Sequence, residues 1–398
     1  MPDNVSMTKA LLVTTSFLPG RGGIESYLAE LCAELAPDLA VLAPAMRDGK
    51  PIPDLPYPTI PYDGQTVVPG RAMVAAIDKA ARDHGVDHVL FGTPWPLALI
   101  GPRVAALGYT YGSIVYGAEL LVPTAVPALR GLILDFLATS DFVLSCSNYT
   151  LSRLSAMLDR RGWSMPPNER LPARVDMGRF TPDADAASFT TGSDRTDSDA
   201  SSVGIRARLG LTDDDRVVLS FGRLVERKGV HRMIDVMPEI NRRVPNAVFV
   251  IAGGGPEEKN LRRQAEVAEA AGGRVIFAGR VPETDAPALF ATADVFTLPV
   301  VDRYFGLEVE GLGVVMLEAG ACGTPSVIGR SGGSPETVID GETGFVIDAR
   351  DRGVLADRVG YLLERPDEAA EMGRKARAFV EREFASAPLP QPLVSWLG

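Results

Sequence analysis

Short apolar runs alternate with helical patterns along most of the chain. Runs such as ALLVTTSF, from Ala10 to Phe17, are short and nearly continuous, and they predict buried strands. Segments such as IESYLAELCAEL, which follow them, place apolar residues at helical spacing. Strands that alternate with helices in this way predict an α/β protein with parallel sheets covered by helices.

The alternation ends once and then restarts at Arg216 to Gly222 (RVVLSFG). The first unit holds the further expected strands HVLFGTP, YGSIVYG and DFVLSCS. The second holds AVFVIAG, VIFAG, DVFTLP and PSVIG, with helices at VHRMIDVMPEINRRV and EEKNLRRQAEVAEA. The stretch between the units is rich in Asp, Ser and Thr and cannot bury enough apolar surface to offset its ordering entropy. We therefore predict an N-terminal domain at 1–181, a polar loop at 182–203, a C-terminal domain at 204–378, and a segment at 379–398 that could return to the N-terminal domain.

Composition narrows the class of protein without identifying it. An apolar fraction of 46% over 398 residues can fill the cores of two domains, and a net charge of −11 disfavours nucleic acid as a partner. The chain shows no signal peptide and no apolar run of about 20 residues, so we expect a cytoplasmic protein. Contact with the inner face of a membrane would then be peripheral and would need a local patch. Cys32, Cys146 and Cys322 are far apart in apolar patterns, which predicts buried free thiols. The three histidines do not cluster, so no metal site is expected.

The stretch VEGLGVVMLEAGACGTP carries the first candidate chemistry. It sets Glu310 and Glu318 on either side of a glycine loop that opens a helix near Val314. Gly311 and Gly313 let the backbone approach a ligand closely, and the first N–H groups of the helix would face a phosphate. Carboxylates accept hydrogen bonds from sugar and ribose hydroxyls. The pattern therefore suits a sugar nucleotide, although two glutamates eight positions apart can also lie on a solvated helix face.

Arg223 and Lys228 are a second pair of candidate site residues. They follow an expected strand and precede an expected helix, where a doubly wound domain binds phosphate. Two cations at this place would neutralise a diphosphate. The alternative is a solvated surface loop, because Glu226 and Arg227 lie in the same segment. Since both residues are expected in a loop, their removal is predicted to impair donor use without unfolding the protein.

These segments resemble a known family. RYFGLEVEGLGVVMLEA resembles the two-glutamate motif of the retaining glycosyltransferases of family 4, and in particular the GDP-mannose-dependent phosphatidylinositol-mannoside type of α-mannosyltransferase. The motifs SFGRLVERKG, IAGGGP, FAGRVP and SGGSPETV follow the order and spacing of that family, and FLPGRGGIE is similar to its N-terminal glycine loop. The resemblance implies the GT-B fold, in which two Rossmann-like domains face each other across a cleft. It also implies retaining transfer of a hexose from a nucleotide sugar, with GDP-mannose as the leading donor, without a metal or other cofactor.

The resemblance also assigns roles to residues. In the matching motifs the positions of Arg223 and Lys228 contact the diphosphate as the sugar bond breaks, while Glu310 orients the sugar and Glu318 the ribose. The base would be read by the backbone near Val281, which leaves guanine or uracil undetermined. The further positions expected to contact the donor are Gly22, Gly23, Gly222, Gly253, Gly311, Leu312, Gly313 and Val314.

Two positions depart from the family pattern. Tyr116 stands where these enzymes often have a histidine that reaches the donor sugar, and a phenol with a pKa near 10 does not titrate near neutral pH. This leaves two functions open: an active transferase in which Tyr116 replaces the histidine, or a non-catalytic sugar-nucleotide-binding protein with a degenerate site. Arg174 stands where glycine is usual before Val-Asp, and we expect it to alter the hinge or to add a cation to the cleft.

The acceptor is the least determined part of the sequence interpretation. The resemblance implies a lipid-linked acceptor, and a small-molecule hydroxyl remains the alternative. The best local candidate for membrane contact is Leu151 to Trp163 (LSRLSAMLDRRGW), where apolar residues recur at helical spacing beside three arginines. The favoured interpretation is a helix that packs this stripe into its own domain, because the stripe is short and Asp159 interrupts its basic end.

Overall fold

A computed structural model describes residues 8–20, 22–47, 49–62, 69–184 and 204–398. The chain divides into two compact units, residues 1–174 with 388–398, and residues 175–387. The division falls between Arg174 and Val175, whereas the sequence placed the end of the N-terminal domain at residue 181. The predicted polar loop lies outside the described residues from position 185 onward.

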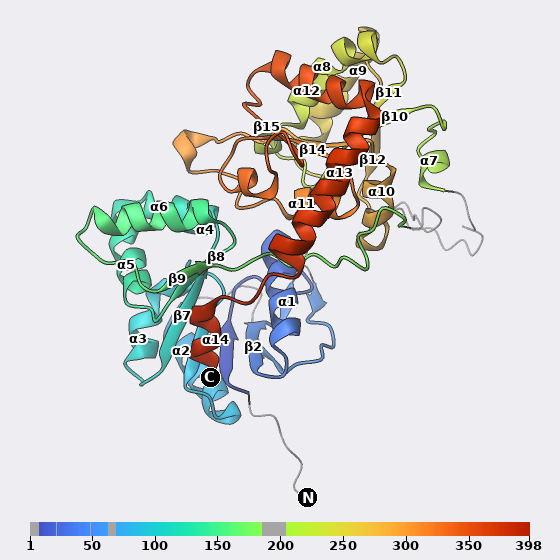
Figure 1. The fold of residues 1–398 in the computed structure, drawn as a ribbon. Helices are drawn as coiled ribbons and strands as arrows, with labels where there is room; N and C mark the ends of the chain where they lie inside the picture. The colour runs from blue at the N-terminus through green and yellow to red at the C-terminus, as the bar shows by residue number, and fades with distance from the viewer. Residues whose placement is uncertain (1–7, 21, 48, 63–68, 185–203) are drawn as a thin grey trace, which may run out of the picture. The chain divides into compact units, whose positions relative to one another are not determined.

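The N-terminal unit contains a seven-stranded parallel sheet in the order β5-β2-β1-β6-β7-β8-β9 (Figure 1). The order reverses between β1 and β6, which is the strand order of a doubly wound dinucleotide-binding fold with one strand added. The strands are β1 (Ala10–Val13), β2 (Leu39–Pro44), β5 (Thr59–Tyr62), β6 (His88–Phe91), β7 (Thr110–Val115), β8 (Val143–Ser145) and β9 (Asn168–Arg170). A separate antiparallel pair joins β3 (Met46–Arg47) and β4 (Lys50–Pro51).

Helices cover this sheet because their apolar stripes match the buried strand residues. The unit contains α1 (Gly23–Leu35), α2 (Arg71–His84), α3 (Gly101–Ala105), α4 (Ala118–Thr124), α5 (Pro127–Ala138) and α6 (Asn148–Asp159). The main core packs residues of α2, α3, α5 and α6 against alternate residues of the strands. The stripe of α6 belongs to this core: Leu151, Leu154 and Leu158 are buried, and Met157 packs against them. The stripe therefore packs into its own domain, as the favoured interpretation predicted, and it does not supply the candidate membrane contact.

The last residues of the chain belong to the N-terminal unit. Helix α14 (Gln391–Leu397) packs against β9, where the Gln391 N–H donates to the Glu169 carboxylate at 2.9 Å. Its Trp396 packs edge-on against Phe142 with ring centroids 5.2 Å apart, and its indole N–H donates to Asp141 at 3.0 Å. The sequence placed the start of the returning segment at residue 379, but the change of unit lies at Pro388.

The C-terminal unit contains a six-stranded parallel sheet in the order β12-β11-β10-β13-β14-β15 (Figure 1). This is the strand order of the Rossmann fold, with the reversal between β10 and β13. The strands are β10 (Arg216–Phe221), β11 (Ala247–Ala252), β12 (Val275–Gly279), β13 (Val295–Leu298), β14 (Ser326–Gly329) and β15 (Gly344–Ile347). Since ligands of open parallel sheets bind beyond the carboxyl ends of the strands at such a reversal, the loops after β10 and β13 mark the expected site.

The helices of this unit are α7 (Ile205–Arg208), α8 (Val230–Arg243), α9 (Glu258–Ala270), α10 (Ala286–Thr292), α11 (Val314–Ala321), α12 (Arg352–Glu364) and α13 (Pro366–Val380). Short 3₁₀ turns occur at Glu226–Lys228, Glu283–Asp285, Tyr304–Gly306 and Ser334–Thr337, and a π turn at Glu381–Ala385 follows α13. The core packs α8, α9 and α12 against the sheet. The helices that the sequence predicted after β10 and β11 are confirmed, as is the helix start at Val314.

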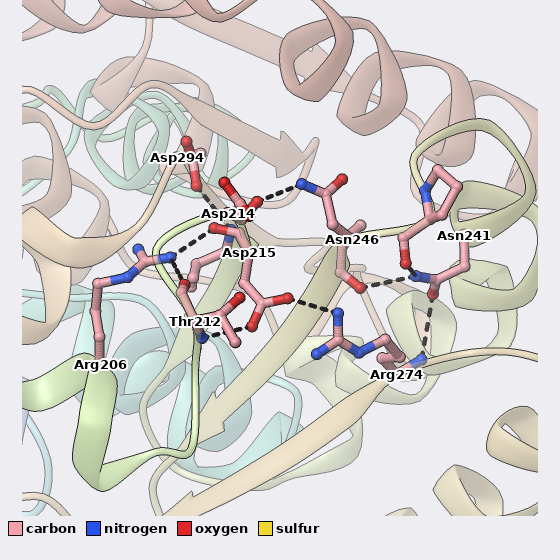
Figure 2. Close-up of polar contacts among 11 residues, drawn as sticks. Arg206, Thr212, Asp214, Asp215, Asn241, Asn246, Arg274 and Asp294 are labelled. Atoms are coloured by element: carbon pink, nitrogen blue, oxygen red, sulfur yellow. Dashed lines mark hydrogen bonds and ion pairs between the residues drawn. The ribbon is translucent and has the colours of Figure 1, made fainter.

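A polar cluster closes the opposite edge of this sheet, where β10 to β13 begin (Figure 2). The buried carboxylate of Asp215 accepts from Arg274 at 2.6 Å and from the backbone N–H of Thr212 at 2.8 Å. The hydrogen bond from Arg274 holds the pKa of Asp215 below its usual value against the effect of burial. Asp294 accepts from the backbone N–H of Val217 at 2.7 Å. These contacts provide hydrogen-bond partners for backbone N–H groups where the strands begin, so we expect this cluster to stabilise the fold and not to bind a ligand.

Two further sequence predictions concern the whole chain. The three cysteines are buried and free, as predicted. No helix in the described part of the chain is long and apolar enough to cross a bilayer.

Candidate active site

The loop after β10 delivers two basic residues to the carboxyl edge of the sheet. Arg223 follows the strand directly, and Lys228 ends the 3₁₀ turn before α8. Gly229 then opens α8 with φ 71°, and a Cβ at this position would lie 2.0 Å from the carbonyl oxygen of Pro299 after β13. Only glycine lets the β10 and β13 loops approach so closely.

The loops after β10 and β11 also touch through glycine. A Cβ on Gly253 would lie 1.8 Å from the carbonyl oxygen of Gly222, and both residues have φ above 130°. Gly222 donates its N–H to Ala252 at 2.9 Å. These two predicted donor-binding glycines therefore fix the backbone that carries Arg223.

Lys228 and Glu310 meet across the strand-order reversal. The Lys228 ammonium lies 2.7 Å from Oε2 of Glu310, and Arg227 donates to the same oxygen at 2.5 Å. Both side chains of the Lys228–Glu310 pair are about nine-tenths buried, with 11% and 9% of their surface exposed. The prediction that Lys228 is a loop residue is right, but the expectation that its removal leaves folding untouched conflicts with this burial.

The charges around Glu310 and Lys228 determine the pKa values of both side chains. Burial alone would raise the pKa of Glu310, but Lys228 and Arg227 together hold it below its usual value. Burial lowers the pKa of Lys228, and the attraction of Glu310 opposes this without cancelling it. Glu310 is therefore ionised at neutral pH. Because both cations contact Oε2, the other oxygen, Oε1, has no hydrogen-bond partner in the described part of the chain and can accept from a ligand.

The backbone of Glu310 is held by the loop after β14. The Glu310 N–H donates to the Ser331 hydroxyl at 3.1 Å, and its carbonyl accepts from the N–H of Gly333 at 2.9 Å. Gly332 has φ 53°, and a Cβ there would lie 2.1 Å from the Glu310 carbonyl oxygen. The segment SGGS therefore positions Glu310.

The glycine loop after Glu310 opens α11 as predicted. Gly313 precedes the helix with φ 96°, a conformation that favours glycine, and Val314 is the first helical residue. Leu312 is buried, whereas Gly311 and Val314 are partly exposed. The free N–H groups of this helix start lie at the carboxyl edge of the sheet, where a phosphate would meet them.

Glu318 lies farther along α11. Removal from water raises its pKa to about 7, with Arg179 opposing and Glu283 adding to the rise. Its carboxyl group has no hydrogen-bond or ion-pair partner among the described residues. A carboxyl group that titrates near neutral pH without a partner can bind a diol once it ionises, because a diol requires acceptors.

Arg223 and Val281 complete the predicted donor residues of this unit. Arg223 is exposed and has no acidic partner in the described residues, and its charge contributes to the lowered pKa of Lys228. Val281 follows β12 and is partly exposed. Arg223, Lys228 and Glu310 are thus brought together, and Arg223 keeps its charge open for an anion.

The N-terminal unit contains the remaining candidates. Gly22 and Gly23 open α1 after β1, at the strand-order reversal of that sheet. A Cβ on Gly22 would lie 2.4 Å from Oε2 of Glu25, so this glycine makes room for the carboxylate. Glu25 in turn pairs with Arg47 at 3.3 Å.

Tyr116 follows β7, but its ring is buried and packs edge-on against Tyr27 with centroids 5.6 Å apart. Its hydroxyl is buried and has no hydrogen-bond partner in the described residues. Burial raises the pKa of Tyr116 well above its usual value. In this conformation the phenol faces the domain interior, and its predicted contact with a donor sugar stays a prediction.

Arg174 is engaged by an acidic partner. Its guanidinium donates to both carboxylate oxygens of Glu34, at 2.7 and 2.8 Å. The two expectations for Arg174, an altered hinge or an added cation in the cleft, stay predictions.

Sequence reasoning missed Arg227 as a site residue. It lies next to Lys228 and bridges Glu310 to Glu308, 3.7 Å from the latter. No local signal marks it, because its partners lie far along the chain.

Comparison with known proteins identifies the family of the chain. A family model for "Glycosyl transferases group 1" matches residues 204–379. The chain is 38% identical to the GDP-mannose-dependent alpha-(1-6)-phosphatidylinositol monomannoside mannosyltransferase of Mycolicibacterium smegmatis, over 92% of each chain. It is 34% identical to the enzyme of that name from Mycobacterium tuberculosis, over 98% of each chain.

Among solved structures, Anabaena HepE in complex with UDP and glucose matches with a TM-score of 0.73. The match covers 98% of this chain and 99% of HepE at 19% identity, so it bears on the fold alone. The predicted GT-B class with two Rossmann-like domains is confirmed. The chain is therefore a glycosyltransferase of group 1, and it belongs to the retaining family 4 in the branch that includes the phosphatidylinositol monomannoside mannosyltransferases.

Proposed function

We propose that this enzyme transfers mannose from GDP-mannose to a phosphatidylinositol-mannoside lipid, with retention at the anomeric carbon. The donor and acceptor are those named for relatives that align over nearly the whole chain. The observation that carries the donor half is the Lys228–Glu310 pair at the strand-order reversal, which leaves Oε1 of Glu310 open beside the exposed Arg223. Nothing in the relatives favours a non-catalytic binding protein.

In the proposed reaction, Arg223 and Lys228 neutralise the diphosphate as its bond to the anomeric carbon breaks. The acceptor hydroxyl attacks the same face of the sugar, and its proton passes to the departing phosphate oxygen. Glu310 holds a sugar hydroxyl, Glu318 the ribose, and the backbone near Val281 the base. The enzyme acts by positioning and by preorganised charge, and two cations take the place that a metal would fill.

A thermal-shift screen tests the donor. A ligand at 100 times its dissociation constant adds about 2.7 kcal/mol of stability, which raises the melting temperature by about 5–10 °C in a domain of this size. We expect GDP-mannose to give this shift and UDP-glucose to give little. Arg223→Ala is the matched variant, because it removes an exposed cation and should lose the shift. Stabilisation by UDP sugars alone would refute the choice of base.

A transfer assay tests the reaction. Purified enzyme with GDP-mannose and phosphatidylinositol monomannoside should give a dimannoside, detected by mass spectrometry, and transfer should continue in excess EDTA. Tyr116→His restores the usual family residue and serves as the control for the non-catalytic alternative. Binding of GDP-mannose without turnover in either form would favour that alternative.

We propose that membrane contact uses α4 and α5 in place of α6. Val122 of α4, Leu132 of α5, and Val126 just before α5 are about half exposed. The Arg161 guanidinium lies beside Gly131 of α5, since a Cβ added at Gly131 would lie 3.5 Å from Nη1 of Arg161. Exposed apolar side chains beside cations suit the interface of an anionic bilayer.

Sedimentation with vesicles tests this contact. We expect binding to phosphatidylcholine vesicles that contain an anionic lipid, with loss on Leu132→Glu and reduced salt-sensitive binding on Arg160→Glu/Arg161→Glu. Val267→Glu, on an exposed site of α9, is the control. No sedimentation of the wild type at low salt would refute the membrane contact and leave the donor assignment standing.

A further inference from the structure

The loop between β13 and Glu310 forms a tight hairpin with aromatic residues at its tip. Arg303 and Glu308 pair as an antiparallel bridge, with backbone N–H···O distances of 3.0 and 3.3 Å. Between them, Phe305 is fully exposed and Tyr304 is 61% exposed. Of the large apolar side chains in the described residues, Phe305 is the most exposed. The hairpin thus presents aromatic rings to the surroundings instead of burying them.

The backbone of this tip is strained. Tyr304 and Phe305 have φ of 48° and 57°, and they are the two non-glycine residues with positive φ among those described. Bulky side chains disfavour this region, and such outliers gather at functional sites. Because the Phe305 ring buries nothing, packing within this unit does not explain its conformation.

Ion pairs and a hydrogen bond hold the hairpin in this conformation and connect it to the candidate active site. The Arg303 guanidinium lies 4.6 Å from the Tyr304 ring centroid and donates to its hydroxyl at 3.1 Å. It also pairs with Glu226 at 2.6 Å and with Glu308 at 3.2 Å. Glu308 in turn lies 3.7 Å from Arg227, which contacts Glu310. An unbroken chain of alternating charges therefore runs from the aromatic tip to the carboxylate proposed to orient the donor sugar.

We propose that the hairpin 303–308 is a platform for the carbohydrate part of the acceptor. The face of Phe305 would stack on the C–H face of a pyranose ring, while the Tyr304 hydroxyl and the Arg303 guanidinium would reach its hydroxyl groups. An exposed aromatic face flanked by hydrogen-bonding groups suits a ring that has both an apolar face and a polar edge. The proposal rests on the proposed function, because it names a second contact of the same acceptor.

The charges of the hairpin favour a sugar ring over an anionic membrane surface as its ligand. Glu226 and Glu308 lie at the base of the hairpin, and both would be repelled by acidic headgroups. A membrane anchor would instead combine apolar side chains with unpaired cations, whereas the guanidinium of Arg303 already pairs with two carboxylates. The observations therefore favour a sugar ring over an acyl chain.

Kinetics with a deacylated acceptor test the platform. The probe is water-soluble glycerophosphoinositol monomannoside, with GDP-mannose as donor. Phe305→Ser should raise the acceptor KM by about 3- to 10-fold, as expected for the loss of one aromatic contact, and leave the donor KM and acceptor-independent donor hydrolysis unchanged. Val267→Ser, which truncates another exposed apolar residue of this unit, should change none of these. An unchanged acceptor KM, or an equal rise in the donor KM, would overturn the proposal.

A binding assay keeps this test independent of turnover. All three native tryptophans, Trp95, Trp163 and Trp396, belong to the N-terminal unit, so Phe305→Trp places the only indole in the C-terminal unit. Its emission should shift to the blue and saturate with the deacylated probe. No shift, or a shift with acylated lipid alone, would overturn the platform. If this shift is seen but GDP-mannose supports no transfer by the wild type, then the proposed donor fails and the platform stands.

Discussion

Arg223 and Lys228 lie in one motif, yet the structure predicts that their removal affects folding differently. Arg223 is exposed and has no acidic partner in the described residues, whereas Lys228 is buried against Glu310 at 2.7 Å. Removal of one partner of a buried ion pair typically costs about 3–5 kcal/mol, because the other charge is left uncompensated. Here Arg227 still contacts Oε2 of Glu310 at 2.5 Å, so we expect about 1–3 kcal/mol for Lys228→Ala.

This loss should lower the melting temperature of the Lys228→Ala protein by about 3–10 °C, while Arg223→Ala melts with the wild type. Both variants should lose transfer by about 10²- to 10³-fold, since each removes a group proposed to stabilise developing charge. Lys228→Met keeps the buried stem and removes the charge, so it should match Lys228→Ala in activity. Scanning fluorimetry and a transfer assay measure the two effects. A Lys228→Ala protein with wild-type stability, or an unstable Arg223→Ala protein, would refute the burial argument.

Three further predictions concern other residues. The pKa of Glu318 is raised from 4.5 to about 7, so the folded state holds its proton more tightly than the unfolded state, and stability should fall as pH rises between these values. Glu318→Gln should remove this dependence of stability on pH, and in urea titrations at pH 8 it should be about 1–3 kcal/mol more stable than the wild type. The variant should also raise the donor KM with little change in kcat. A variant whose stability falls with pH in parallel with the wild type would contradict the assignment. Asp215→Asn should cost about 1–3 kcal/mol, because it weakens a charge-assisted bond to Arg274 at the edge away from the site, and an altered KM would contradict that placement. Tyr116→Phe removes a hydroxyl that has no hydrogen-bond partner in the described residues and should stabilise the protein by up to about 1–2 kcal/mol in the same titrations, and loss of transfer would show that the phenol contacts substrate.

The sequence was informative wherever the signal is local. Apolar periodicity predicted the strands and helices around the site, and glycine before a helix predicted the starts of α8 and α11. Gly313 is an example: its φ of 96° follows from the need for a residue without Cβ at that turn, and the letters alone show this residue type.

Contacts between distant segments were not predictable in the same way. Arg227 and Glu310 are 83 positions apart, and only the strand order brings the loops after β10 and β13 together. Burial was equally hidden. The apolar stripe of α6 left both a membrane face and a packed helix open, because periodicity cannot tell whether a stripe meets lipid or protein. The structure packs Leu151, Leu154 and Leu158 into the core, as the favoured interpretation had it. The strained tip was not predictable either: Gly306 marks a turn there, but the positive φ falls also on Tyr304 and Phe305, which are residue types that rarely adopt it.

The geometry of Glu310 indicates how diphosphate and sugar binding could be coupled. In the free protein, Lys228 and Arg227 both contact Oε2, and Oε1 remains open. A diphosphate that attracts the Lys228 ammonium would weaken its contact with Oε2, because one ammonium divides its interaction among all nearby anions. That oxygen would then be freer to accept a second sugar hydroxyl, while Arg227 keeps the carboxylate ionised and in place. Each half of the donor would thus prepare the site for the other, and an intact nucleotide sugar would bind more favourably than its two parts added separately.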